Sequence, residues 1–333
     1  MSSRHRTNPK AHGRLSVDPA PDAHHRPPGD QDLREERGET PRLQAPRRFV
    51  DLHTHSTASD GGLDPAEVIR LADQARLGAV ALTDHDTVDG LDEARRAATQ
   101  CPNLVFVPGI EISACFPRGT LHLLGLGIDP ASDTLSAALE TLQAARAERN
   151  PRMLKRLGEL GMPLDMEDVL AAAGPAPAGQ RHVVSRAHIA EAMRRKGYVS
   201  DLRQAFARWI GQGKPAYFDK ERLAPAQAIG AIRRAGGLAI LAHPVHLQLD
   251  NRLQLERVVR DLAGHGLDGI EVYHSDHSDA LTRICLDLAR RLGLAVTGGS
   301  DFHGPPKPHV RLGHPRVPLA ALGQAVHQLI RRP

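Results

Sequence analysis

The feature that most constrains the fold of this chain is a series of short apolar segments, each of which contains or is followed by histidine or an acidic residue. The first segment, residues 49–52, is followed by His53 and His55. Because alternate residues of a strand point to the same side, both imidazoles can face one site at the end of that strand. Further segments of this kind are residues 79–83, 104–107, 121–125, 238–242, 269–273 and 294–300.

Helical patterns lie between several of these segments, at residues 65–77, 88–99, 225–235, 253–264 and 279–292. Short apolar runs closed by turn residues are typical of strands buried on both faces, as in a parallel sheet. The alternation of strand and helix predicts an α/β fold, and about seven such strands favour a closed or nearly closed barrel over an open sheet. Barrel enzymes carry their chemistry at the C-terminal ends of the strands, which is where these histidines and acids lie.

The composition divides the chain into three regions. Residues 1–47 are rich in Arg, Pro, Asp and Gly and nearly free of large apolar residues, so we expect a disordered N-terminal extension. Residues 131–217 lose the strand pattern and show helical stretches, which predicts a helical insertion that covers the site. We expect residues 48–130 and 218–333 to form the barrel.

Composition also limits partners and location. The net charge of +4 suits an anionic substrate, while one Trp and three Tyr provide little aromatic stacking surface, so sequence-specific DNA binding is not expected. We find no apolar run of 18 residues and no apolar N-terminal signal, so we expect neither membrane association nor secretion. Three scattered cysteines predict reduced thiols and a cytoplasmic location.

Nine side chains of metal-ligand type accompany the predicted strands: His53, His55, Asp60, His85, Glu111, His122, His243, Asp301 and His303. One transition ion takes about four to six ligands, so this set is large enough for two or three divalent ions. Mixed histidine and carboxylate ligands suit Mn²⁺, Fe²⁺ or Zn²⁺ and argue against Ca²⁺. Burying so many ionisable groups without cations would be costly, and neighbouring divalent ions suit phosphoester hydrolysis. Histidines outside this set, such as His246, His274 and His277, are interpreted as structural.

Five motifs, at residues 53–55, 83–86, 109–111, 242–244 and 299–303, occur in the order found in one family. Over residues 49–303 the chain resembles the PHP (polymerase and histidinol phosphatase) phosphoesterases. The resemblance implies a distorted (β/α)₇ barrel with a trinuclear metal centre. In some relatives the position of Asp60 is a histidine, so the shorter acid changes the charge of its site. The implied ligands are His53, His55, Glu111 and Asp301 for the first ion, Glu111, His122 and His243 for the second, and Asp60, His85 and His303 for the third.

Within the insertion, residues 184–190, 196–199 and 213–217 resemble a subgroup of nucleoside 3′,5′-bisphosphate phosphatases and 5′→3′ exoribonucleases of short RNA. This implies that Arg186 and His188 hold phosphate, with Lys214 and Ser113 as further candidate contacts. Asp301 is the ligand on which turnover is expected to depend most directly. The expected partners are small nucleotides and short RNA 5′ ends.

Three other functions remain open at this level. A histidinol-phosphate phosphatase would use the same barrel, although the inserted Ser-x-x-His pattern at residues 185–188 argues against it. A binuclear amidohydrolase shares the first H-x-H motif, but many of them need a bridging lysine that no predicted strand carries. A non-catalytic metal-binding module would lack ligands, whereas each position of the set is filled here.

Overall fold

The computed structural model describes residues 47–174 and 183–331. The predicted N-terminal extension, residues 1–47, therefore lies outside the described residues except for its last position. Within the described part, one eight-stranded sheet has the order β7-β6-β5-β4-β3-β2-β1-β8. The strands are β1 (Phe49–Thr54), β2 (Ala79–Leu82), β3 (Val105–Ala114), β4 (Leu121–Leu126), β5 (Leu238–Leu241), β6 (Gly269–His274), β7 (Ala295–Gly299) and β8 (Val317–Pro318).

The sheet closes nearly completely, because the chain after β7 returns to the end of β1. The backbone N–H of Asp301 donates to the carbonyl of His53 at 2.9 Å, and that of His55 donates to the carbonyl of Phe302 at 2.8 Å. This confirms the predicted α/β barrel. It also brings residues 53–55 and 301–303, far apart in the sequence, to one end of the barrel.

Strand β4 departs from the parallel arrangement, since it runs antiparallel to both β3 and β5. The connection from β3 to β4, residues 115–120, is too short for the crossover that parallel neighbours need. β3 also continues past the predicted segment to Ala114, so Glu111 lies inside a strand rather than after one. The hairpin therefore places Glu111 beside the neighbouring strand that carries His122.

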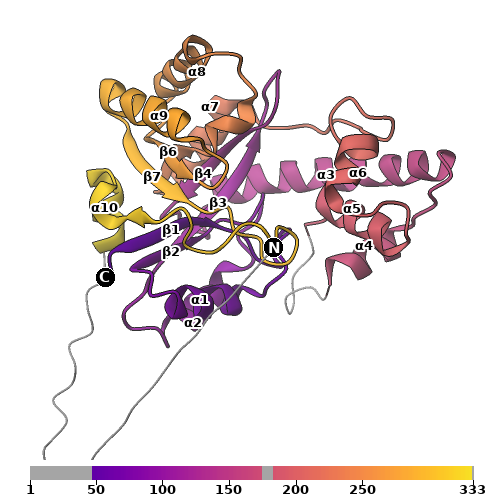
Figure 1. Cartoon of the computed structure of the whole chain (residues 1–333), viewed down its shortest axis with the longest axis horizontal. Helices are drawn as coiled ribbons and strands as arrows, with labels where there is room; N and C mark the ends of the chain where they lie inside the picture. The colour runs from indigo at the N-terminus through magenta and orange to yellow at the C-terminus, as the bar shows by residue number, and fades with distance from the viewer. Residues whose placement is uncertain (1–46, 175–182, 332–333) are drawn as a thin grey trace, which may run out of the picture. The chain divides into compact units, whose positions relative to one another are not determined.

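The helices that cover the strands are α1 (Pro65–Gln74), α2 (Leu91–Ala98), α7 (Pro225–Arg234), α8 (Arg252–Gly264), α9 (Asp279–Leu292) and α10 (Gln324–Arg331) (Figure 1). Local signals set their ends. Proline opens α1 and α7, where its missing N–H costs nothing. Ser278 caps α9 by accepting from the N–H of Leu281, and Gly293 ends it in the left-handed conformation. Short 3₁₀ turns, Pro244–Leu247 and Leu319–Ala321, complete this part.

The described residues of the predicted insertion are helical and contain no strand. They form α3 (Asp133–Glu159), α4 (Met166–Ala173), α5 (Arg186–Arg195), α6 (Leu202–Ala205) and a π-helical turn, Phe206–Ile210. The first half of α3 packs into the barrel core through Leu135 and Leu142, whereas Met153 and Leu157 in its second half belong to a separate core shared with α5. Figure 1 shows α4, α5 and α6 gathered around that second half. One long helix thus connects both cores.

No helix in the described ranges combines the length and the apolar composition that crossing a membrane requires.

The closure between β7 and β1 leaves no room for a side chain at Gly299. A Cβ there would lie 2.4 Å from the Cβ of His53 and 2.5 Å from its backbone nitrogen. We predict that Gly299→Ala destabilises the protein by about 2 kcal/mol, the usual scale of overpacking, measured as a lower Tm by circular dichroism.

Gly158, near the end of α3, provides the matched control, because an added Cβ there meets nothing within 4 Å. Gly158→Ala should leave stability unchanged or raise it by up to about 1 kcal/mol through helix propensity. A Gly299→Ala variant with a wild-type Tm would contradict the observed packing of β7 on β1.

Candidate metal centre

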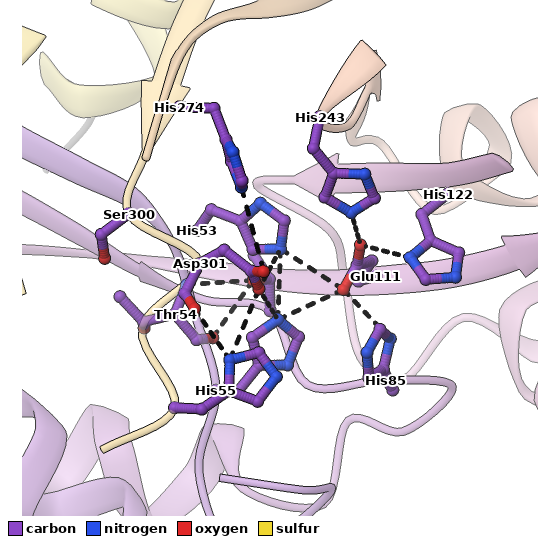
Figure 2. A network of polar contacts seen from close by, with 12 residues as sticks. His53, Thr54, His55, His85, Glu111, His122, His243, His274, Ser300 and Asp301 are labelled. Atoms are coloured by element: carbon purple, nitrogen blue, oxygen red, sulfur yellow. Dashed lines mark hydrogen bonds and ion pairs between the residues drawn. The ribbon is translucent and has the colours of Figure 1, made fainter. Parts of the chain in front are cut away.

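Glu111, fully buried on β3, lies at the centre of the clustered side chains (Figure 2). Its Oε1 lies 2.8 Å from both His122 Nδ1 and His243 Nε2. Its Oε2 lies 3.0 Å from His85 Nδ1 and 3.2 Å from His55 Nε2. Each carboxylate oxygen faces a different set of imidazoles, which is an arrangement suited to a carboxylate that bridges two cations.

His53 in β1 and His55 directly after it point to the same side, as predicted from their spacing. The Nε2 atoms of His53 and His55 lie 3.1 Å apart. Oδ1 of Asp301 lies 3.4 Å from the first and 3.2 Å from the second, and Glu111 Oε2 is within 3.3 Å of both. Ligand atoms of these four residues all lie within 4.8 Å of one another, close enough to share one ion.

A second group forms around Asp60, in the turn after β1. Its Oδ1 lies 3.4 Å from His303 Nε2, and its Oδ2 lies 3.9 Å from His85 Nε2. The turn can fold back over His55 because Gly61 has no side chain. A Cβ at Gly61 would lie 2.5 Å from the carbonyl oxygen of His55. The structure therefore brings together the residues predicted for a third ion, with His55 at their edge.

Two of the predicted ligands adopt backbone conformations that L-residues rarely use. His243 has φ of 23° and Asp301 has φ of 58°. Such conformations cost about 1–3 kcal/mol each and are concentrated at functional sites. The strained turns direct both side chains toward Glu111 and His55 rather than along the strands.

Glu271 on β6 orients two of these residues, and our sequence analysis did not identify it. Its Oε1 lies 3.0 Å from His53 Nδ1, and its Oε2 accepts the backbone N–H of His243 at 2.7 Å. Partners of this kind fix the ring orientation of metal-binding histidines. The sequence signal that could have identified Glu271 is an acidic residue inside an otherwise apolar strand.

His274 and Lys307 also border the group, although neither belonged to the predicted set. His274 ends β6, and its Nε2 lies 3.9 Å from Asp301 Oδ2. We interpreted His274 as a structural histidine, but it lies at the edge of the ligand cluster. Lys307 Nζ donates to the same oxygen at 2.8 Å. This contact leaves Oδ1 of Asp301 to face His53 and His55.

Burial and the neighbouring carboxylates shift the pKa values of the clustered residues in opposite directions. Burial lowers the pKa of both His85 and His243 to about 3, against the opposing effect of Glu111, so their imidazoles are neutral. Burial lowers the pKa of His55 too, but Asp301 and Glu111 outweigh it and raise that pKa to about 9. For Glu111 burial raises the pKa, yet the surrounding histidines hold it well below its usual range. Without bound ions the group therefore combines the ionised carboxylate of Glu111 with neutral imidazoles at His85 and His243 and a protonated imidazole at His55, which would have to release its proton to bind a cation.

Several buried polar atoms here have no hydrogen-bond partner within the described protein. They include Glu111 Oε2, His55 Nδ1, His85 Nδ1, His243 Nδ1 and His274 Nε2. Glu111 Oε2 and His85 Nδ1 lie at ion-pair distance without the alignment of a hydrogen bond. Buried polar groups are rarely left unpaired, so bound divalent cations account for these atoms better than packing does. The residues present fit such ions.

The predicted phosphate-binding pair lies in the first turn of α5. Ser185 caps this helix, and its backbone N–H donates to His188 Nδ1 at 3.2 Å. The guanidinium of Arg186 lies over the rings of Phe206 and Tyr217, 5.6 and 5.4 Å from their centroids. Arg186 is therefore a packed and partly buried cation rather than a solvated one.

The other two candidate contacts lie in different surroundings. Ser113 is buried on β3, and its N–H and hydroxyl both donate to the carboxylate of Asp86, at 2.9 and 3.3 Å. Lys214 is exposed in the turn after the π-helical segment. Ser113 lies opposite His122 in the β3–β4 ladder, and the phosphate-binding roles of Ser113 and Lys214 stay predictions.

No family model matches the chain. Among curated proteins, a 3′,5′-nucleoside bisphosphate phosphatase of Chromobacterium violaceum is 37% identical over 80% of this chain and 90% of its own length. A 5′-3′ exoribonuclease of Haemophilus influenzae is 34% identical over 77% of this chain and 90% of its own. The 5′-3′ exoribonuclease Rnm of Escherichia coli is 32% identical over 86% of this chain and 94% of its own length.

Two solved structures are similar in fold. An amidohydrolase from Chromobacterium violaceum, with bound sulfate and no metal, has a TM-score of 0.76 at 34% identity. The match covers 84% of this chain and 95% of that one. A structure from Bifidobacterium adolescentis assigned to the metal-dependent phosphoesterases has a TM-score of 0.75 at 30% identity. The match covers 86% of this chain and 96% of that one. The similarity extends through both the barrel and the helical segment, because the matches cover nearly all of each solved structure.

We predict that Glu111→Ala loses most of the bound transition metal, because this carboxylate faces two sets of imidazoles at once. The metal content of purified protein, measured by mass spectrometry, should fall to less than half of the wild-type value. Glu159→Ala, at an exposed position on α3, is the control and should keep its metal. Full metal content in the Glu111→Ala protein would show that ions bind elsewhere.

Proposed function

We propose a reaction for this chain from one established premise: it belongs to the PHP family of metal-dependent phosphoesterases, because relatives 32–37% identical span most of its length. The chain is a hydrolase of phosphate esters. We propose that its substrate is a nucleoside 3′,5′-bisphosphate, which it converts to the nucleoside 5′-monophosphate and phosphate. We further propose that it degrades short 5′-phosphorylated RNA from the 5′ end.

The metal ligands are proposed in the three sets that the geometry around Glu111 supports. When bound, divalent ions such as Mn²⁺, Fe²⁺ or Zn²⁺ would supply Lewis acidity that activates water and neutralises charge on the phosphoryl oxygens. Glu111 would join two of the sets through its two oxygens. The proposed ligands are His53, His55, Glu111 and Asp301, then Glu111, His122 and His243, then Asp60, His85 and His303.

Arg186 and His188 are proposed to hold and orient the phosphate. A guanidinium binds phosphate through two parallel hydrogen bonds and stays charged, which also complements the charge that develops during the reaction. The hydrogen bond from Ser185 to His188 Nδ1 places the proton of a neutral ring on Nε2, so this atom is the donor. Ser113 and Lys214 are kept as lesser candidates for phosphate contacts.

Protonation of the leaving oxygen by His243 or His303 is not part of the proposal. Burial lowers the pKa of His243 to about 3, and burial, followed by the nearby Lys307, lowers that of His303. Neither ring holds an acidic proton at neutral pH, and both are proposed ligands. His243 and His303 are therefore kept as proposed ligands, and bound divalent ions would supply the charge neutralisation at the leaving oxygen.

The observation that carries this proposal is the convergence of the predicted ligand set, in which side chains from β1, β3, β4 and the segments after β1, β2, β5 and β7 meet at one end of the barrel. A non-catalytic module would have lost some of them. The free cysteines Cys101, Cys115 and Cys285 fit our proposal of a cytoplasmic location. Histidinol phosphate remains the second candidate substrate, because it would use the same ligands.

We predict that Asp301→Ala abolishes phosphatase turnover, by at least about 1,000-fold, and lowers the bound metal. Release of phosphate from adenosine 3′,5′-bisphosphate, followed together with metal content, is the measurement. Asp92→Ala, at an exposed position on α2, should behave as wild type. An Asp301→Ala enzyme with full rate and intact metals would refute the assignment.

A parallel assay separates the candidate substrates. We expect kcat/KM for the nucleoside bisphosphate, or for a 5′-phosphorylated oligoribonucleotide, to exceed that for histidinol phosphate by at least about 100-fold. Equal or reversed values would favour the histidinol-phosphate reaction instead.

A further inference from the structure

A buried carboxylate that is not a proposed ligand lies between two segments that carry ligands. Asp84 lies shortly after β2, directly before His85, and is 2% exposed. Within the described ranges its carboxylate contacts hydrogen-bond donors of serine residues and forms no ion pair with a lysine or an arginine. Burying a carboxylate without a paired cation is costly, so the hydrogen bonds that it accepts have to hold it in place.

Three donors from the turn after β1 satisfy the Asp84 carboxylate. Its Oδ1 accepts the backbone N–H of Ser56 at 2.8 Å and the hydroxyl of Ser59 at 2.6 Å. Its Oδ2 accepts the hydroxyl of Ser56 at 2.7 Å. Hydrogen bonds to an ionised acceptor are shorter and stronger than those between neutral groups. The end of β2 therefore holds the turn after β1 through a single side chain.

The turn that Asp84 holds carries Asp60, a proposed ligand. Ser59 directly precedes Asp60 in the sequence. The carbonyl of Ser56 accepts the backbone N–H groups of Ser59 and Gly61, at 3.1 and 2.9 Å. The backbone on both sides of Asp60 is thus tied to Ser56, and Ser56 is tied to Asp84. Loss of the Asp84 carboxylate would release the turn on which the orientation of Asp60 depends.

Asp84 therefore connects two ligands that are proposed for the same ion. It is the chain neighbour of His85, and it fixes the turn that presents Asp60. Oδ2 of Asp60 and Nε2 of His85 lie 3.9 Å apart, close enough to share one cation. The third ligand of this set, His303, comes from another segment, where its carbonyl accepts the N–H of Gly62 at 2.8 Å.

The same arrangement recurs at the ligand set proposed for the first ion. Asp51 on β1 is fully buried, and its carboxylate accepts both the backbone N–H and the hydroxyl of Ser300, at 2.8 and 2.6 Å. Ser300 directly precedes the proposed ligand Asp301. In both cases a buried aspartate accepts two donors of a serine that adjoins a ligand in another segment. This repetition favours a positioning role over an incidental contact.

We infer that Asp84 is the positioning residue for the ion proposed at Asp60, His85 and His303. Its carboxylate sets the turn after β1 against the end of β2, so that the ligand atoms of Asp60 and His85 face one cation. Asp84 does not bind the cation itself, because both of its oxygens accept from serine donors. This inference rests on the proposed function for the three ligand sets.

Manganese binding to the full chain, titrated by calorimetry after EDTA has removed the metal, tests the role without activity. Residues that orient metal ligands typically contribute 10- to 100-fold to affinity, so Asp84→Ala should weaken one class of Mn²⁺ sites at least about 10-fold and spare the others. Asp84→Asn can still accept from Ser56 and Ser59 through Oδ1, so it should restore part of that affinity. An unchanged titration, an equal loss at every site, or no recovery in Asp84→Asn would overturn the inference.

Ser59→Ala is the second variant if Asp84→Ala proves unstable by Tm. It removes the shortest hydrogen bond to Asp84 and keeps the carboxylate, so the same class of sites should weaken at least about 3-fold. Ser132→Ala removes a serine hydroxyl that caps α3 and is the matched control, with wild-type Mn²⁺ binding expected. Wild-type binding by Ser59→Ala would count against the role of Asp84.

Anomalous diffraction from crystals of Asp84→Ala, grown with Mn²⁺, identifies the affected ion. The peak beside Asp60 should be weakened relative to wild type, while the peak between His53 and His55 should stay. A full peak beside Asp60 would refute the positioning role and leave the proposed function standing. A wild type with Mn²⁺ at all three sets that hydrolyses neither the nucleoside bisphosphate nor the oligoribonucleotide would refute the proposed function and leave the positioning role standing.

Discussion

A carboxylate buried inside a barrel needs positive charge beside it, and in this molecule that carboxylate is Glu111. Its two oxygens face imidazoles from β1, β4 and the loops after β1, β2 and β5, within 2.8–3.3 Å. The carboxylates of Glu111, Asp301 and Asp60 are gathered at this one buried site, and several of the polar atoms here have no hydrogen-bond partner in the part of the chain that the structure describes. Divalent cations would resolve this imbalance, and the fold holds the candidate ligand atoms of each group within 4.8 Å of one another.

The barrel supplies that geometry through close backbone contacts. Gly299 packs directly on His53, Gly61 packs on the carbonyl of His55, and His243 and Asp301 accept positive φ angles. Each feature carries a cost in conformational freedom or in strain. Their concentration at one end of the sheet indicates that the site, rather than the core, determines these positions. The helical segment then brings positively charged side chains to the same end of the barrel through α3, which belongs to both hydrophobic cores.

Much of this could be predicted from the sequence, because strand periodicity and strand ends are local features. His53 and His55 face one way as their spacing requires, and the predicted ligands meet at one end of the barrel. The antiparallel β4 and the extension of β3 were not predicted, since pairing direction depends on the connection and not on the apolar pattern. Glu271 was missed because its contacts with His53 and His243 join segments that are far apart in the sequence.

The central claim is that Glu111 lies between bound cations, and anomalous diffraction tests it most directly. Crystals grown with excess Mn²⁺ and measured near the manganese absorption edge should show at least two anomalous peaks, one beside each carboxylate oxygen of Glu111. Those peaks should lie about 2–2.3 Å from the histidine nitrogens that face each oxygen. An empty site under these conditions, with the same side chains pointing apart, would contradict the account.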